Sequence, residues 1–555
     1  MSKTGNTIVL ILITLLLSAL VIGCSDNTVV NHELQNDIST SDSSSDLTNG
    51  QVEILRMSGG DSGYPTPWLR GRKGGGNRTI NLIYDSLLEK DDKSIIPWLA
   101  KEYEILDGGK QYLFTLRDNV IWHDGTPFSA EDVKFTFDYT KDFPMVESPI
   151  SSTDIENVEV IEPNQVLITV TEIGAPLLER IGKVRIVPKH IWENVDDPNE
   201  YEAENATVGT GPYMLADYNK SAGTYKYEAF SEFWGPTPGA KILIRFPVSD
   251  GVLALEAGEI DIVRHVPNDL LEKFEADPDY KVVVGPALSG SRLLFNLNGN
   301  SLLNEKSLRQ AIAYAIDTYE LIEKLGRGIG EPSNSGILPP AHNMYNPNVR
   351  QYDCDLIKCQ ELFSVLGYTE QDQSGFVINE KGERISLNLL IGEDSIRSAE
   401  LVKEQLQRAG IELNIYSMDG SAQETQVREG EFELAIVGHA GLGDDPDYLR
   451  ERFCVDEEMG RASAQMATIG YYNEYLFTLL SEQRMIMDFE ERKNMLYEIQ
   501  EILAEEVLEI PLYFGYDYTV YRPANYDEWI HEYDARNFTD AKLSYVLYSQ
   551  WNEKQ

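Results

Sequence analysis

The chain has 555 residues, 42% of them hydrophobic, so it is too long for a single core and too apolar to be disordered. It carries 91 acidic and 47 basic residues, which give a formal net charge of −44. This balance repels phosphate backbones and anionic lipid head groups, and we therefore expect no nucleic acid among its partners.

The amino terminus resembles a lipoprotein signal peptide. An apolar run at residues 8–22 follows one basic residue and is followed by a glycine and Cys24. We expect residues 1–23 to be removed and Cys24 to be lipidated, which would anchor the protein at the outer, extracytoplasmic or periplasmic face of the cell membrane. An uncleaved anchor is the alternative. Residues 24–50 are rich in Ser, Asp, Asn and Thr, and this composition predicts a flexible tether.

Residues 53–57 predict a first strand, which runs into a loop rich in glycine at residues 58–65. Glycines and a proline after a strand form a loop that can approach a ligand closely. Tyr64 and Trp68 lie in and just after this loop, and we take both as candidates for packing on a ligand.

A stretch near residue 120 carries a dense local pattern. Residue types alternate from one position to the next over residues 112–122, with the period expected for two half-buried strands. Asp-Gly at 124–125 predicts a hairpin turn. Ser129 lies three residues before Asp132, which is the spacing of a capping box that opens a helix. His123 stands beside the turn, where we expect a structural, hydrogen-bonded imidazole.

Further motifs follow along the chain. They are Val-Gly-Thr-Gly-Pro-Tyr at 208–213, Phe-Trp-Gly at 233–235, Ala-Leu-Glu-Ala-Gly-Glu-Ile-Asp-Ile at 254–262 and Arg-Gln-Ala-Ile-Ala-Tyr-Ala-Ile-Asp at 309–317. Together with residues 111–139, they resemble the extracytoplasmic solute-binding proteins of family 5, the substrate-binding lipoproteins of peptide and nickel ABC importers. The resemblance covers about residues 51 to 550.

The resemblance implies an α/β, two-lobe periplasmic-binding-protein-like fold of class II, cluster C type, with an extra inserted subdomain. In that family the two lobes close around a ligand by hinge motion. We expect the hinge beside residues 209–213 and 285–296. The expected bounds are 51–80, 201–288 and 508–555 for lobe I, 81–200 for the inserted subdomain, and 289–507 for lobe II.

Lobe II is expected to contain a parallel sheet. A strand at 386–391, a helix at 395–409 and strands at 411–416 and 432–437 alternate in the way that predicts parallel α/β structure. The other elements expected here are a strand at 293–297, helices at 308–315, from 353 to 367 and around 496–503, and a strand at 510–514.

Catalytic and cofactor motifs are absent. The sequence has no Gly-x-Ser-x-Gly, His-Glu-x-x-His or Walker A motif, so we expect no enzyme activity and no cofactor. Gly209 and Gly211 lack the lysine of a phosphate loop and instead predict a turn into a strand. Cys354 and Cys359 point apart on one predicted helix, so they should not pair with each other. The sequence leaves open a disulfide from Cys454 to one of them. No cysteine or histidine spacing supports a zinc site.

Residues 437–448 resemble the Gly-Trp…Asp-Pro region that lies beside the cleft in the family. Two departures matter: His439 occupies the usual tryptophan position, and Leu442 stands where peptide binders commonly carry an aspartate that pairs with the peptide amine. Asp444 or Asp445 are the candidates to replace that aspartate, and capping of a turn and helix is the structural alternative for both. His439 would be the ligand if the solute is nickel.

Arg292 is the cation that we expect to bind a ligand carboxylate, because a planar guanidinium can bind a carboxylate with two hydrogen bonds. A surface salt bridge is the structural alternative. Asn296, near the end of the same predicted strand, is a further candidate ligand-binding residue.

We therefore expect a monomeric substrate-binding component of an ABC importer, which captures an oligopeptide or peptide-like solute and delivers it to permease subunits and their ATPase. The alternative within the same class is a protein that binds nickel or a metal chelate. A secreted hydrolase that uses cleft carboxylates is the alternative from another class, since 91 acidic residues bring some pair together by chance. A sensor or chaperone that binds peptide segments without transport is the third.

Overall fold

The structure is a computed structural model that describes residues 48–68, 76–146, 148–298, 302–439, 442–443, 445–456, 461–462, 470–532 and 538–552. Residues 50–555 make up one compact unit. The expected signal peptide, Cys24 and nearly all of the expected tether lie outside the described residues. Within the described ranges, no helix combines the length and the hydrophobicity needed to span a bilayer.

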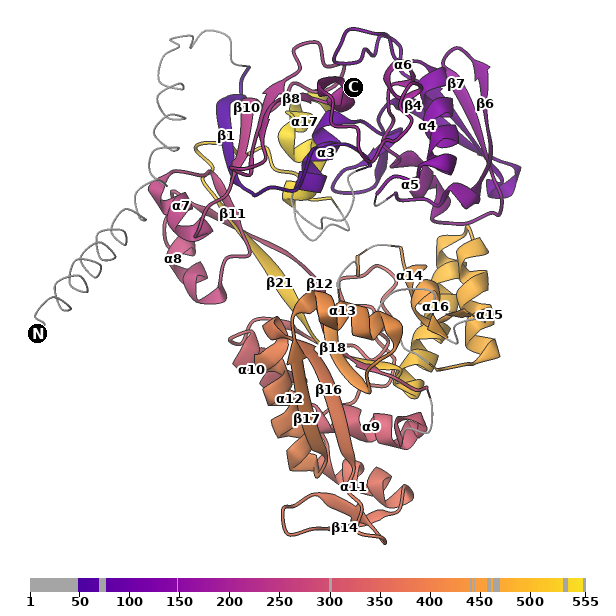
Figure 1. The fold of residues 1–555 in the computed structure, drawn as a ribbon, viewed down its shortest axis with the longest axis vertical. Coiled ribbons are helices and arrows are strands. Elements are labelled where there is room, and N and C mark those ends of the chain that lie inside the picture. Colours follow the sequence, from indigo (N-terminus) through magenta and orange to yellow (C-terminus); the bar gives the residue numbers. More distant parts are fainter. Residues whose placement is uncertain are drawn as a thin grey trace, which may run out of the picture. The chain divides into compact units, whose positions relative to one another are not determined.

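One large sheet organises this unit (Figure 1). Among the described residues it has eleven strands, in the order β17-β16-β18-β12-β21-β11-β1-β10-β9-β8, and β13 pairs with β21 outside this path. The strands are β1 Val52–Ser58, β8 Tyr213–Asn219, β9 Thr224–Ala229, β10 Ala240–Phe246, β11 Ile262–Arg264, β12 Lys281–Phe295, β13 Glu331–Pro332, β16 Ser386–Gly392, β17 Glu412–Met418, β18 Leu434–His439 and β21 Glu509–Tyr521.

β12 and β21 are the two long strands that cross from one half of the sheet to the other (Figure 1). The start of β12 pairs with the end of β21 beside β11, and the end of β12 pairs with the start of β21 beside β18. The antiparallel register shifts between Gly285 and Ser289. An irregularity of this kind bends a strand pair locally. We call the stretch where β12 and β21 pass from one half of the sheet to the other the crossing; it includes residues beside which the hinge is expected.

The first lobe is built on β1 and β8 to β11. Buried side chains from these strands, such as Leu55, Tyr213 and Leu243, pack with the helix α3 (Gly76–Ile83) and with Tyr545 near the carboxyl terminus. Beside them lie α7 (Gly251–Ala257), α8 (Leu271–Glu275) and α17 (Tyr548–Asn552).

The predicted turn at residues 209–211 is confirmed and leads directly into β8. A Cβ added at Gly209 would lie 1.9 Å from the carbonyl oxygen of Ile83, so only glycine allows this close approach of two backbones. His123 is hydrogen-bonded here as predicted, because Nε2 lies 2.9 Å from the Gly211 carbonyl and Nδ1 accepts from the Gly209 N–H.

The inserted subdomain has its own four-stranded sheet, in the order β4-β5-β7-β6. The predicted helix is confirmed as α4, which begins with the capping box of Ser129 and Asp132. The predicted second strand at 120–122 is reduced to a single bridge between Ile121 and Pro127, because β5 pairs with β4 and β7 instead. The elements are β2 Leu88–Lys90, β3 Ile95–Pro97, β4 Ala100–Leu106, β5 Gln111–Leu116, α4 Ala130–Asp142, β6 Ile155–Glu162, β7 Gln165–Val170, α5 Leu177–Gly182 and α6 Lys189–Trp192.

The second lobe is built on β16, β17 and β18, which are parallel as predicted. The helix that was expected from residue 353 begins only after Asp355, which accepts hydrogen bonds from two backbone N–H groups and caps it. The helices are α9 Lys306–Ala315, α10 Thr318–Leu325, α11 Leu356–Val365, α12 Ile396–Ala409, α13 Gly420–Glu429, α14 Tyr448–Phe453, α15 Glu474–Glu482 and α16 Phe489–Glu506, and the short strands are β14 Tyr368–Gln371, β15 Val377–Asn379, β19 Val455–Asp456 and β20 Arg461–Ala462.

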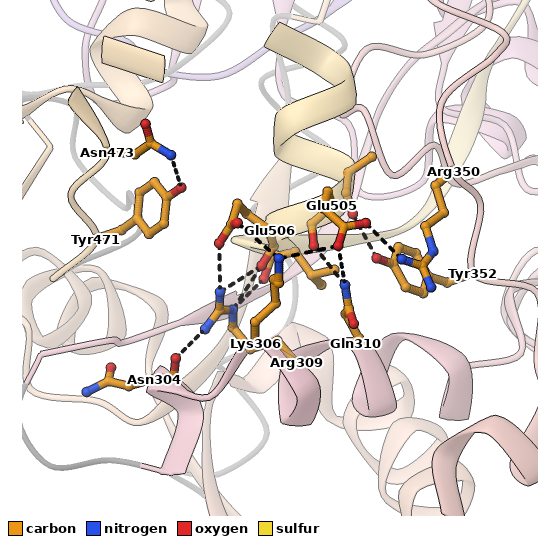
Figure 2. Close-up of polar contacts among 12 residues, drawn as sticks. Asn304, Lys306, Arg309, Gln310, Arg350, Tyr352, Tyr471, Asn473, Glu505 and Glu506 are labelled. Atoms are coloured by element: carbon orange, nitrogen blue, oxygen red, sulfur yellow. Dashed lines mark hydrogen bonds and ion pairs between the residues drawn. The ribbon is translucent and has the colours of Figure 1, made fainter. Parts of the chain in front are cut away.

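A polar network fixes the point where α16 ends and β21 begins (Figure 2). The side chain of Arg309 is 3% exposed, and its guanidinium donates to the backbone carbonyls of Glu506 and Val507. It also donates to the carbonyls of Leu303 and Asn304. These carbonyls include the last ones of α16, which have no partner within the helix. Arg309 therefore holds the start of a crossing strand in place.

Candidate functional site

The carboxyl ends of the parallel strands in both lobes lie beside the crossing. In the first lobe, Arg264 at the end of β11 pairs with Thr519 of β21. In the second lobe, His439 at the end of β18 pairs through its backbone with Gly290 of β12. Open α/β sheets bind ligands outside the carboxyl ends of their strands, where the strand order reverses. We therefore place the candidate site between these strand ends.

The first lobe contributes a cavity of about 220 Å³ at the carboxyl ends of β1, β10 and β11. Arg245, Arg264 and His265 bring cationic or basic groups to its lining. Asp540 also lines it and forms an ion pair with Arg264, with 3.2 Å between Nη1 and Oδ1. Buried Tyr545 supplies an aromatic wall.

His265 connects this cavity to the crossing. Its Nδ1 lies 2.7 Å from a carboxylate oxygen of Asp517, whose side chain is 4% exposed. Asp517 pairs with Gly285 at the edge of the irregular stretch of β12 and β21. His265 itself has a φ of +55°, a left-handed conformation that is uncommon outside glycine. Backbone strain of this kind often accompanies functional sites.

The second lobe contributes the segment that follows β18. Leu442 is fully buried and packs against Ala287 and Phe514, which belong to the two crossing strands. The Leu442 side chain thus forms an apolar contact with the two crossing strands.

Two aspartates of this segment bind guanidinium groups of α14 and α16. Asp445 forms two hydrogen bonds of 2.6 Å to the guanidinium of Arg492 and also accepts from the Asp447 N–H. Asp447 is fully buried and pairs with Arg450. Burial alone would raise the pKa of Asp447, but the guanidinium of Arg450 and its neighbours outweigh it and lower that pKa. The placement of Asp445 agrees with the structural alternative.

The inserted subdomain touches the second lobe next to these aspartates. Nη2 of Arg180, on α5, lies 3.2 Å from Oδ2 of Asp447. The backbone N–H of Ala175 donates to the carbonyl of Arg484 over 2.7 Å. These contacts join the inserted subdomain to the second lobe at a place away from the crossing.

Tyr64 and Trp68 lie in the first lobe. The Tyr64 ring is half-buried against Tyr218, and its hydroxyl donates to the Ala203 carbonyl. Trp68 is 1% exposed, contacts the ring of Trp192 and donates from Nε1 to the Phe143 carbonyl. These contacts favour a core role for Trp68 and leave Tyr64 partly accessible.

Arg292 and Asn296 lie at the second-lobe end of β12. The Arg292 side chain is 3% exposed and forms an ion pair with Glu509, so the surface salt bridge considered from sequence is in fact buried. Burial lowers the pKa of Arg292 to about 10, against the opposing effect of Glu509. The Asn296 amide donates to the carbonyls of Gly430 and Phe432. Both placements favour structural roles.

Two predicted site residues, His439 and Asp444, have no described side chain. Asp444 lies outside the described residues, and only the backbone of His439 is described. Among the described residues, no group of three or more His, Cys, Asp or Glu side chains is arranged to hold a metal ion. Cys354, Cys359 and Cys454 are free thiols, so the disulfide that the sequence left open is not formed.

The sequence analysis missed Arg245, Arg264 and His265. A signal was available, because Arg264 and His265 come just after the motif at 254–262, whose Ile260 and Ile262 are typical of a buried strand, and ligand-binding groups often lie at strand ends. The partner strands β1 and β10 come from distant parts of the chain, so the cluster itself could not be seen in the sequence.

Two lobes joined by two crossing strands, with strand ends on both sides of the crossing, define the class of two-lobe α/β solute-binding receptors. The family model "Bacterial extracellular solute-binding proteins, family 5 Middle" matches residues 94–460, which is more than half of the chain. The chain belongs to this family, and the expected fold class is confirmed.

Individual relatives agree with this assignment. Heme-binding protein A of Haemophilus influenzae is 26% identical over 463 residues, which cover 79% of this chain and 82% of the relative. The dipeptide-binding protein of Escherichia coli is 25% identical over 396 residues, 66% of this chain and 71% of the relative. The crystal structure of NikA from Brucella suis in complex with Fe(III)-EDTA superposes with a TM-score of 0.76 at 22% identity, covering 87% of this chain and 98% of NikA.

Proposed function

We propose that this protein is the substrate-binding component of an ABC importer and that it captures an oligopeptide or peptide-like solute outside the membrane for delivery to the permease. The observation that carries the proposal is the meeting of strand ends from both lobes at the crossing of β12 and β21. A solute bound there would favour the closed arrangement to the extent that it contacts both lobes. The dipeptide-binding relative supports a peptide-like solute.

The proposal includes the domain bounds and the assembly expected from the sequence. Lobe I would comprise 51–80, 201–288 and 508–555, the inserted subdomain 81–200 and lobe II 289–507, and the receptor would act as a monomer. The solved complex of NikA with Fe(III)-EDTA makes a metal chelate the second candidate solute. Because the family consists of binding proteins, we do not propose the hydrolase.

We expect ordinary free dipeptides to bind poorly. Leu442 offers an apolar side chain where an amine-pairing aspartate is common, and loss of one partner of a buried ion pair costs about 3–5 kcal/mol, or at least about a hundredfold in affinity. Longer or amino-terminally blocked peptides should bind better. Calorimetry with free dipeptides and with blocked tripeptides and longer peptides tests this, after native mass spectrometry has identified any solute that co-purifies.

Submicromolar binding of several free dipeptides would contradict the specificity prediction while leaving the importer role intact. No binding of any peptide, together with a co-purified metal chelate, would replace the peptide proposal by the chelate candidate.

We also propose that Cys24 is lipidated and tethers the protein to the membrane. Replacement of Cys24 by Ala should release the protein into the medium or leave the signal unprocessed, because the thioether to the lipid cannot form. Fractionation and metabolic labelling with a fatty acid would check this. Unchanged lipid labelling of the Cys24→Ala variant would refute the anchor.

A further inference from the structure

The cavity of the first lobe lies where a solute held between the lobes would meet it. β1 and β10 run parallel, β11 is parallel to β1, and all three end at this cavity. The β11 register places Arg264 opposite Thr519, and the following residue, His265, reaches Asp517 at the crossing. The cavity is therefore on the side of the first lobe that faces the hinge.

The lining of this cavity is rich in guanidinium groups. Arg245 and Arg264 both contribute, and among the described lining residues only Asp540 carries a carboxylate. The Asp540 carboxylate pairs with Arg264. Asp61, on the loop after β1, is not a lining residue, and its carboxylate accepts hydrogen bonds from the Tyr218 hydroxyl and the Gly63 N–H.

The loop after β1 is shaped around Arg245. A Cβ added at Gly59 would lie 3.2 Å from Nε of Arg245 and 3.4 Å from its Nη2, so the absence of a side chain lets the guanidinium lie against this loop. The backbone N–H of Gly59 in turn donates to the Phe246 carbonyl at the end of β10. The guanidinium is thus held at the strand ends by packing on a fixed loop.

The net charge of the whole chain is opposite in sign to the guanidinium groups that line this cavity. With a formal net charge of −44, the protein repels anions at long range. Two guanidiniums at the strand ends form a local cationic site, which can hold an anionic group against this long-range repulsion. A planar guanidinium binds a carboxylate or a phosphate through two parallel hydrogen bonds.

We propose that this cavity binds a carboxylate of the solute, with Arg245 as the principal ligand-binding residue and Arg264 as its partner. The inference rests on the proposed function and names a chemical requirement of the solute. The volume of about 220 Å³ accommodates one end of a peptide-like molecule rather than all of it. Because the amine-pairing aspartate is replaced by Leu442, the carboxylate becomes the main charged anchor.

The test compares N-acetyl-trialanine with its carboxyl-terminal amide by calorimetry. The wild-type protein should bind the acid about tenfold or more tightly than the amide, as expected for charged hydrogen bonds. Arg245→Gln should remove this preference by weakening the binding of the acid more than that of the amide, Arg264→Gln should reduce it, and Arg245→Lys should restore part of it. Lys241→Gln is the matched control, since Lys241 lies at the opposite end of β10 and pairs with Glu53.

Equal binding of acid and amide by the wild type, or an acid preference that survives Arg245→Gln, would overturn the inference while leaving the importer role untouched. If neither peptide binds, short peptides are excluded as solutes. Thermal unfolding with succinate, citrate and inorganic phosphate then tests whether the cavity binds a carboxylate. Stabilisation of the wild type by the carboxylates but not of a folded Arg245→Gln variant supports the inference. Stabilisation by phosphate alone, or by none of the three, overturns it.

Discussion

Replacement of Arg309 by Met is expected to destabilise the protein by about 3–5 kcal/mol, because it leaves several buried carbonyl groups without a donor and each such group costs about 1–3 kcal/mol. The methionine fills the space of the side-chain stem but cannot donate. It would leave the Glu506 carboxylate without this partner and the carbonyls at the end of α16 without their donors. Urea unfolding followed by circular dichroism measures the change.

Lys306→Met is the matched control for this experiment. Lys306 lies on the same helix and pairs with Glu505 and Glu506, but its side chain is 41% exposed (Figure 2). Exposed pairs contribute less than about 1 kcal/mol, so the control should unfold close to the wild type. A loss of equal size in both variants would mean that the buried network does not hold the start of β21.

A second large effect is expected at Lys542. Its side chain is 1% exposed, and its ammonium lies 2.7 Å from Asp85 and 3.0 Å from Glu89. Lys542→Met would leave two buried carboxylates without their shared cation, again at a cost of about 3–5 kcal/mol near neutral pH. Lys101→Met is the control, because Lys101 pairs with exposed Asp118 in the inserted subdomain.

The stabilisation that Lys542 provides should change with pH in a defined direction. Burial works to raise the pKa of Glu89, but Lys542 outweighs it, so the folded pKa is lower than the ordinary value. In the wild type, this stabilisation is present above the unfolded pKa of about 4.3 and is lost as pH falls through the folded pKa.

In the variant, the burial of Glu89 is no longer opposed by Lys542, and protonation of Glu89 at acid pH relieves that part of the cost. The difference between wild type and Lys542→Met should therefore shrink as pH falls below about 5. A difference that is constant between neutral and acid pH would show that the ionised carboxylates are not its cause.

Features that depend on neighbouring residues could be predicted from the sequence. The capping box of Ser129 and Asp132 and the helix ends at Gly258 and Gly410 were set by local chemistry, and the structure shows each of them. The parallel arrangement of β16, β17 and β18 followed from the alternation of strands and helices.

Features that depend on distant pairings could not be predicted. Arg292 was taken as a ligand-binding cation because nothing near it in the sequence shows its partner, which is 217 residues away at Glu509. The ion pair of Arg264 and Asp540 likewise joins residues 276 positions apart. The first-lobe cavity is built from such pairings, so its cationic lining appears only once the strands are assembled.

Small-angle X-ray scattering tests the central claim, that a solute held at the crossing closes the two lobes. The protein would be freed of co-purified solute by unfolding and refolding, and measured before and after that solute is returned at saturation shown by calorimetry. The account predicts a smaller radius of gyration with the solute bound, because contacts with both lobes favour the closed state. An unchanged radius of gyration at full saturation would contradict it.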